Sequence, residues 1–145
     1  MSDPLTPAQR HKCMASIHGS STKPEVKVRR WLWRAGYRYR LNVKSVPGKA
    51  DIVLRRYHTA IFVNGCFWHG HNCERFRLPK SNTEFWKAKI ERNKARDAEN
   101  YKTLAEAGWH IIVIWECQLT SGRIDETMRQ VELQLSRWLL EINKR

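Results

Sequence analysis

The segment Cys66-Phe-Trp-His-Gly-His-Asn-Cys73 carries two thiols and two imidazoles within eight residues. This spacing suits a tetrahedral zinc site, and a fourth ligand must then come from elsewhere in the chain. Cys117 lies just past a predicted strand that ends at Trp115, and a strand end can return to a loop that leaves the same sheet. We therefore predict a zinc site that ties these two segments together. With four protein ligands, the ion would be structural.

The imidazole ligand of this site stays open at this point. His69 and His71 both lie within reach of the thiols, so spacing does not choose between them. An incidental cluster of cysteines and histidines is the alternative to a metal site. Cys13 is left over and is predicted to be a plain thiol.

The length and charge of the chain indicate one folded domain with a polyanionic partner. A chain of 145 residues, 41% of them hydrophobic, is long enough for one compact domain with a real core, so we expect a single domain, 1–145. Lys and Arg number 27 against 14 acidic residues, a net charge of +13 that is spread along the chain. Nucleic acid is therefore favoured over a membrane surface. The seven Trp residues agree, because aromatic rings can stack on bases as well as fill a core.

The compartment follows from what the sequence lacks. No apolar run approaches the roughly 20 residues that cross a bilayer, and the N-terminal residues contain no signal-peptide core. We expect a cytoplasmic protein with no membrane partner. Thiols stay reduced there, which favours metal ligands or free thiols over disulfides.

The first half of the chain predicts a helix followed by strands. Thr22-Lys-Pro-Glu25 marks a helix start that should run to Ala35 and stop at Gly36. Strands are predicted over 37–41, 51–55 and 59–63. If the hairpin between the last two is symmetric about Tyr57, Val53 faces Ile61 and Asp51 faces Val63.

The second half predicts a loop, a long helix, a strand and a last helix. A loop rich in Gly, His and Cys covers 64–82, and Ser81-Asn-Thr-Glu84 reads as a capping box for a helix that ends before Gly108. A buried strand over 109–115 and an amphipathic helix over 124–143 follow. The fold class is therefore α/β, a central mixed sheet flanked by helices, which is a nuclease-like plan. One face of the long helix carries Trp86, Ile90, Asn93, Asp97, Tyr101 and Leu104.

Four side chains could hydrolyse a phosphodiester, a reaction that needs a cation ligand and a base. Asp51 at a strand start suits Mg²⁺, although an Asp after Pro-Gly is also a common turn residue. Glu25 has a stronger competing explanation, since the capping box alone accounts for an acid at that position. His69 in its Gly-rich loop could act as general base near neutral pH. Asp97 points inward and needs a partner, either His69 or an Arg or Lys.

Phe67 and Trp68 form an aromatic pair in a polar loop of a basic protein. Exposed aromatic residues of this kind can insert into a base stack, and a mismatched step costs less to open. Covering of the zinc site by one of them is the alternative.

Several motifs in one order carry a family resemblance. They are Thr22-Lys-Pro-Glu25, Pro47-Gly-Lys-Ala-Asp51, Phe62-Val-Asn-Gly-Cys-Phe-Trp-His-Gly-His-Asn-Cys73, Asn93-Lys-Ala-Arg-Asp97, Gly108-Trp109 and Trp115-Glu-Cys117. From about Arg10 to Leu119, the chain resembles the very short patch repair (Vsr) mismatch endonucleases. The resemblance implies a restriction-endonuclease-like (PD-(D/E)XK-type) fold and a Mg²⁺-dependent enzyme. Such enzymes nick duplex DNA on the 5′ side of the mispaired T in a T:G mismatch.

The resemblance also implies residue roles. Asp51 and the backbone carbonyl of Val63 would hold Mg²⁺, and His69 would be the general base with Asp97 and Glu25 as supporting acids. The implied structural zinc ligands are Cys66, His71, Cys73 and Cys117. The implied wedge is Phe67, Trp68 and Trp86 from the major groove, with Met14 approaching from the opposite groove. The N-terminal segment 1–21 would contact DNA, and the protein would act as a monomer, with mismatch-repair proteins as further partners.

Two positions depart from the family pattern. Asn64 stands where the family often has a second active-site His, and Ala50 replaces a Pro before the catalytic Asp. An Asn can donate a hydrogen bond but cannot take up a proton at neutral pH, so we expect Asn64 only to position other groups. Two other functions stay open: a restriction or phage-defence nuclease of different specificity, and a non-catalytic zinc-stabilised DNA-binding module.

Overall fold

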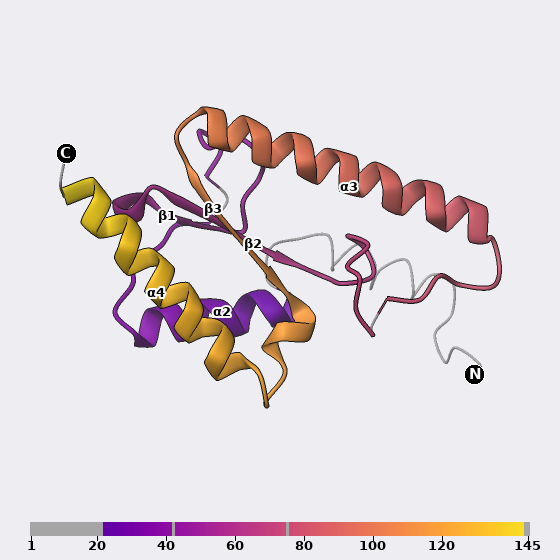
Figure 1. The fold of residues 1–145 in the computed structure, drawn as a ribbon, viewed down its shortest axis with the longest axis horizontal. Coiled ribbons are helices and arrows are strands. Elements are labelled where there is room, and N and C mark those ends of the chain that lie inside the picture. Colours follow the sequence, from indigo (N-terminus) through magenta and orange to yellow (C-terminus); the bar gives the residue numbers. More distant parts are fainter. Residues whose placement is uncertain (1–21, 42, 75, 144–145) are drawn as a thin grey trace.

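A computed structural model describes residues 22–41, 43–74 and 76–143 of the chain. It shows a small α/β arrangement in three layers, with a mixed sheet between one long helix and a pair of helices (Figure 1). The elements in chain order are α2 (Lys23–Arg34), β1 (Ile52–Leu54), the 3-10 helix η1 (Arg55–Tyr57), β2 (Thr59–Asn64), α3 (Thr83–Glu106), β3 (His110–Trp115), the 3-10 helix η2 (Glu116–Leu119) and α4 (Ile124–Asn143). The α/β class is confirmed.

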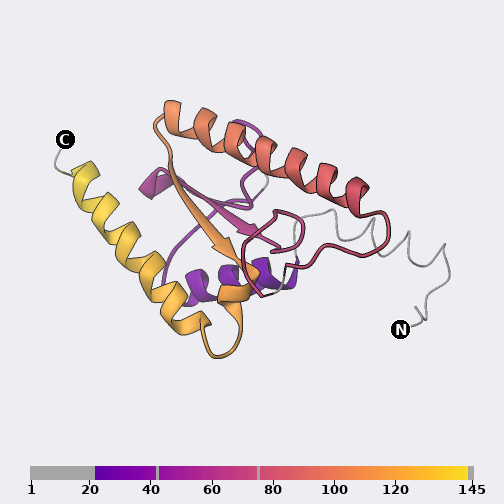
Figure 2. The same ribbon diagram turned by 45° about the vertical axis from the view of Figure 1, so that its right-hand side comes forward.

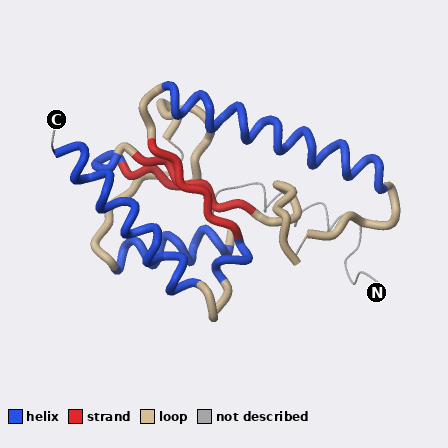
Figure 3. The backbone as a smooth tube through the Cα atoms, viewed as in Figure 1, coloured by secondary structure: helices blue, strands red, loops and turns tan. Residues whose placement is uncertain are grey.

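The sheet has the strand order β1-β2-β3 within the described residues, and it lies at the centre of the molecule (Figure 3). β1 and β2 are antiparallel neighbours, whereas β3 runs parallel to β2 after a crossover through α3. A parallel pair requires such a crossover, because a tight turn can join only antiparallel strands. The crossover is what carries α3 across the end of β2, where the candidate site lies.

The sheet is covered on both faces. α3 lies on one side and α2 and α4 lie on the other (Figure 2). One core cluster joins the sheet to α2 and α4 and includes Leu32, Ile61 and Leu135, and a second joins it to α3 and includes Phe62 and Leu104. All six residues of β2 are buried for this reason. Strands covered on both faces are expected to be apolar throughout, as 60–63 are.

Two sequence predictions for the strands were wrong in detail. The hairpin register is displaced by one residue, so that Val53 pairs with Ala60 and not with Ile61. The cause is the connection: η1 is followed by His58 in a left-handed conformation with φ of 50°, which makes the turn asymmetric. The predicted strand over 37–41 is reduced to one bridge between Arg40 and Val53.

The predictions for α2 and α4 are confirmed, and the prediction for the start of α3 is wrong. α2 begins after Thr22, whose hydroxyl accepts a hydrogen bond from the Glu25 amide at 3.4 Å, and the chain turns away at Gly36 with φ of 93°. α4 has the predicted bounds. The capping box at Ser81 was wrong, because α3 begins after Asn82, which has φ of 55° and makes no side-chain capping bond.

The predicted inward face of α3 is confirmed. Ile90 and Leu104 are buried, and the other four members of that face are partly covered while most of their helical neighbours are exposed. None of the helices in the described ranges is long and apolar enough to span a membrane.

Candidate active site and metal-binding cluster

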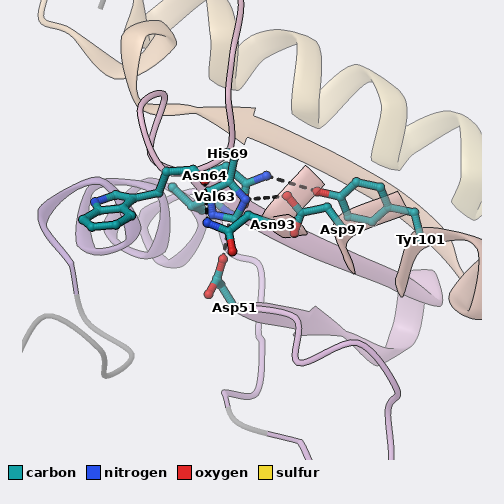
Figure 4. Close-up of polar contacts among 8 residues, drawn as sticks. Asp51, Val63, Asn64, His69, Asn93, Asp97 and Tyr101 are labelled. Atoms are coloured by element: carbon teal, nitrogen blue, oxygen red, sulfur yellow. Dashed lines mark hydrogen bonds and ion pairs between the residues drawn. The ribbon is translucent and has the colours of Figure 1, made fainter. Parts of the chain in front are cut away.

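Asp51 lies where β1 begins, beside the end of β2. The amide of Val63 donates a hydrogen bond of 2.7 Å to its Oδ2 atom (Figure 4). The sequence predicted this neighbourhood, and it holds despite the displaced register because the carboxylate reaches the Val63 amide from the adjacent position. The bond fixes one carboxylate oxygen and leaves Oδ1 for other contacts.

A second acid, Glu25, lies close to Asp51. It stands in the first turn of α2 and is only 5% exposed. The pKa of Asp51 is raised from 3.8 to about 7, mainly by burial and also by the neighbouring Glu25, while the Val63 amide and Arg29 oppose the shift. Two neighbouring carboxylates with little access to water form a place where a cation would be stabilised.

His69 and Asp97 form a pair beside these acids. Nδ1 of His69 lies 2.5 Å from Oδ2 of Asp97, and both side chains are partly accessible. Of the two partners that the sequence left open for Asp97, the structure shows the imidazole. Because Nδ1 faces the carboxylate, Nε2 is the nitrogen left to act on another molecule.

Asn64 and Tyr101 form a third polar contact at the same edge (Figure 4). The Nδ2 group of Asn64 donates a hydrogen bond of 3.1 Å to the Tyr101 hydroxyl oxygen. Asn64 is 4% exposed, so this phenol satisfies an amide that little water can reach. Sequence reasoning placed Tyr101 on the inward face of α3 but did not assign it to the site.

The loop after β2 is held against α3 by specific contacts. Asn93 donates from Nδ2 to the carbonyl of Trp68 at 2.9 Å. Gly70 adopts φ of 62°, and a Cβ atom there would lie 2.8 Å from side-chain atoms of both Ile90 and Lys94. Glycine is therefore required on two counts, conformation and space. Asn93 was also missed, although its spacing of four residues before Asp97 was the available signal.

Three side chains of this loop converge with the side chain of Cys117. The ligand atoms of Cys66, His71, Cys73 and Cys117 all lie within 4.8 Å of one another. His71, and not His69, is the imidazole of the group, with Nδ1 3.6 Å from the sulfur of Cys117. The His71 ring stacks on Trp115 at 4.1 Å, which orients it. This cluster could hold a metal ion.

The carboxylate of Glu116 supports the cluster from outside. Its Oε1 accepts a hydrogen bond of 3.0 Å from the amide of Cys66, which fixes the start of the loop to the end of β3. Burial raises the pKa of the Cys66 thiol to about 12 in the metal-free protein. Metal binding would therefore displace a proton from this sulfur.

The aromatic residues of the site form one cluster. Phe67 contacts Trp68 and Trp86 at 5.3 and 5.6 Å between ring centroids, and Trp68 lies 5.8 Å from Trp86. Phe67 and Trp68 are both partly buried. The rings thus support one another at the rim of the site. Met14 and Cys13 lie outside the described residues.

Comparisons with known proteins find similarity to DNA endonucleases. A family model described as DNA mismatch endonuclease Vsr matches residues 2–75. The chain is 48% identical over 124 residues to the type II nicking enzyme V.NmeAIP of Neisseria meningitidis, covering 86% of this chain and 89% of that protein. It is 42% identical over 132 residues to the type II nicking enzyme V.XorIIP of Xanthomonas oryzae, covering 90% and 97%. It is 37% identical over 139 residues to the DNA mismatch endonuclease Vsr of Escherichia coli, covering 96% and 88%.

The chain is a DNA endonuclease, a hydrolase. It belongs to the Vsr family of DNA mismatch endonucleases.

Proposed function

We propose that this endonuclease nicks duplex DNA on the 5′ side of the mispaired T in a T:G mismatch, with Mg²⁺ as cofactor, and so initiates very short patch repair. The observation that carries the proposal is the meeting of two acids with the His69–Asp97 pair at one edge of the sheet. The acids supply ligands and the imidazole supplies a base. Phosphodiester hydrolysis needs both.

The donor set fits Mg²⁺. The ligands would be the Asp51 carboxylate and the Val63 carbonyl, with Glu25 as a nearby supporting acid, and hard oxygen donors of this kind are what Mg²⁺ prefers. The pKa of Asp51 is raised mainly by burial and also by Glu25, and a bound divalent cation would offset both effects. A bound Mg²⁺ supplies charge stabilisation to the phosphate in the transition state.

A side chain of the protein removes the proton of the attacking water. The Asp97 carboxylate orients the His69 ring through Nδ1, so that Nε2 takes a proton from the attacking water. The water oxygen then bonds to phosphorus as the bond to the leaving oxygen breaks, and the leaving oxygen takes a proton from solvent water. Asn64 cannot accept that proton, and its hydrogen bond to Tyr101 gives it a positioning role.

The Cys and His cluster is proposed to hold structural zinc. Three thiolates and one imidazole are typical of closed tetrahedral zinc sites, with Zn–S distances of about 2.3 Å. Ligand atoms within 4.8 Å of one another can close around such an ion with small shifts. The ion would brace the loop that carries His69 between β2 and η2.

The aromatic cluster is proposed to read the mismatch. Phe67, Trp68 and Trp86 would enter the base stack from the major groove, and Met14 from the opposite groove. Residues 1–21 would contact DNA in this arrangement. Inserted rings unstack a base step at a cost that is lower at a mismatch, which would favour T:G over matched pairs.

The chain would be a single restriction-endonuclease-like domain that acts as a monomer in the cytoplasm. Mismatch-repair proteins would be its partners in addition to DNA.

A second candidate function is a nicking enzyme of different specificity, belonging to a restriction or defence system. Two similar proteins are named type II nicking enzymes, and this naming favours the second candidate. The non-catalytic alternative is not kept, because the chain belongs to a family of DNA endonucleases.

One experiment separates these functions. Otherwise identical duplexes with and without one T:G pair are incubated with Mg²⁺ and either the wild-type protein or Asp51→Ala. Nicking confined to the mismatched duplex and lost in Asp51→Ala supports the proposal. Equal nicking of matched DNA supports the second candidate, and binding without cleavage would overturn both.

A further inference from the structure

A basic hollow lies along α2, and its Arg29 lies beside Glu25. Its volume is about 300 Å³. Its lining residues are Val26, Arg29, Arg30, Trp33, Arg34 and Tyr39. Three of these are arginines and none is acidic. The helical members follow the spacing of one helix face, so that the positive charges form a single strip.

The exposed aromatic ring in this hollow is held in a fixed orientation. Trp33 is 54% exposed, yet the Arg38 guanidinium lies 3.7 Å above its ring and Tyr39 packs edge-on at 6.1 Å. Arg38 is itself fixed, since its Nη1 donates to the carbonyls of Trp33 and Tyr37 at the end of α2. We name Arg29, Arg30, Trp33, Arg34 and Arg38 the α2 basic face. The Trp33 ring and the Arg38 charge are therefore preorganised before any partner binds.

Arg29 contributes hydrogen-bond donors without acceptors. Its Nε and Nη2 atoms are buried and have no hydrogen-bond partner within the described parts of the chain. The carboxylate of Glu25 is 3.9 Å from Nη2, which is an ionic contact but too long for a hydrogen bond. Arg29 also lines the hollow, so a phosphate oxygen that entered it would lie close to this guanidinium charge.

We infer that the α2 basic face binds the sugar-phosphate backbone of the duplex arm that flanks the cleaved step. Guanidinium groups match phosphate geometry, and a Trp ring can lie against a sugar. Glu25, near Asp51, and Arg34 are nine residues apart on one helix. At about 1.5 Å per residue this is roughly 14 Å, or about four base pairs from the catalytic centre.

This contact carries no base readout, because phosphate contacts position a duplex without specifying its sequence. It therefore rests on the chain being a DNA endonuclease and not on the T:G preference of the proposed function. Matched duplex DNA tests it equally well.

The test measures binding of duplexes that are extended on one side of the nicking position at a time. Full-length protein is used in zinc-containing buffer without Mg²⁺, so that DNA is not cut. The variants are Arg30→Glu/Arg34→Glu and the milder Arg30→Gln/Arg34→Gln. The matched control is Arg129→Glu/Arg137→Glu, which changes two exposed arginines of α4 by the same charge.

Extension on one side should tighten binding of the wild-type protein roughly tenfold, and both α2 variants should lose that gain while the α4 control keeps it. The slope of log affinity against log salt should fall by about 2 in the α2 variants, one unit per lost phosphate contact. Nicking at saturating DNA should stay within about twofold of wild type. The inference is overturned if the α2 variants keep the gain, if the α4 control loses as much, or if nicking at saturating DNA collapses.

Discussion

The side-chain amide of Asn64 donates a hydrogen bond of 3.1 Å to the phenol oxygen of Tyr101, and this contact joins the end of β2 to the middle of α3. Burial raises the pKa of Tyr101, and the charges of Asp97 and Asp51 raise it further, so the phenol keeps its proton at neutral pH. Tyr101 therefore accepts from Asn64 and retains one proton to donate. The pair therefore provides hydrogen bonds at this edge of the site.

Tyr101→Phe should lower the free energy of unfolding by about 1–3 kcal/mol, because the buried Asn64 amide loses its acceptor. Chemical denaturation measures this. Tyr57→Phe is the matched control, since the structure shows no hydrogen bond of its hydroxyl among the described residues, and it should change little. In a double-mutant cycle, Asn64→Ala and Tyr101→Phe should be non-additive. Additive effects would mean that the contact contributes nothing.

His69 is predicted to be the general base and Asn64 a positioning residue. His69→Ala should slow single-turnover nicking about 10²- to 10⁴-fold, the usual contribution of a positioned base. Asn64→Ala should slow it only about tenfold, the size of one lost hydrogen bond. Asp97→Asn should fall between them, because the imidazole loses its orienting charge. Near-normal nicking by His69→Ala together with loss in Asn64→Ala would reverse the assignment.

The Cys and His cluster is predicted to stabilise the fold through zinc. Cys117→Ser should reduce bound zinc from about one ion per chain and lower the free energy of unfolding by about 3 kcal/mol or more. Elemental analysis and thermal unfolding measure the two effects. Cys13→Ser is the control, since the sequence predicts Cys13 to be a plain thiol. Equal zinc content in the two variants would exclude the cluster as the zinc site.

The raised pKa of Asp51 predicts how stability depends on pH. The ionised form of Asp51 is destabilised in the folded protein. The contribution of Asp51 to the free energy of unfolding is therefore fully present below its unfolded pKa of 3.8 and is lost as pH rises through about 7. Asp51→Asn removes this loss. It should exceed wild type in unfolding free energy by up to about 4 kcal/mol at pH 8 without Mg²⁺, and by little near pH 4.

Unfolding titrations of wild type, Asp51→Asn and the exposed control Glu99→Gln check this prediction. Glu99→Gln should follow wild type across the range. A constant difference between wild type and Asp51→Asn from pH 4 to pH 8 would contradict the burial effect. Addition of Mg²⁺ should stabilise the wild type and not Asp51→Asn.

The helices could be predicted because their signals are local. The Thr22 cap and Gly36 bound α2 through contacts within one turn, and periodicity alone placed Asp97 on the inward face of α3. The start of α3 failed because Asn82 adopts a left-handed conformation and the Thr83 hydroxyl instead donates to the carbonyl of Pro79 at 2.8 Å. A capping motif does not show whether its residue will be the cap.

The sequence predicted those parts of the site that lie at the ends of strands. It did not predict the contacts that depend on how α3 crosses the sheet. Cys117 was placed near Cys66 because β3 ends beside the loop that leaves β2, and the structure brings them together. The hydrogen bonds of Tyr101 and Asn93 depend on the angle at which α3 crosses the sheet. No local pattern in the sequence encodes that angle.

The position and strand of the nick test the central claim most directly. A duplex with one T:G pair, labelled separately on each strand, is incubated with Mg²⁺ under single-turnover conditions, and the products are resolved at single-nucleotide length. The account predicts one incision, in the strand with the mispaired T and on its 5′ side, that disappears in Asp51→Asn although this variant still binds the duplex. Cleavage of both strands, equal cleavage of matched DNA, or an unchanged rate in Asp51→Asn would contradict it.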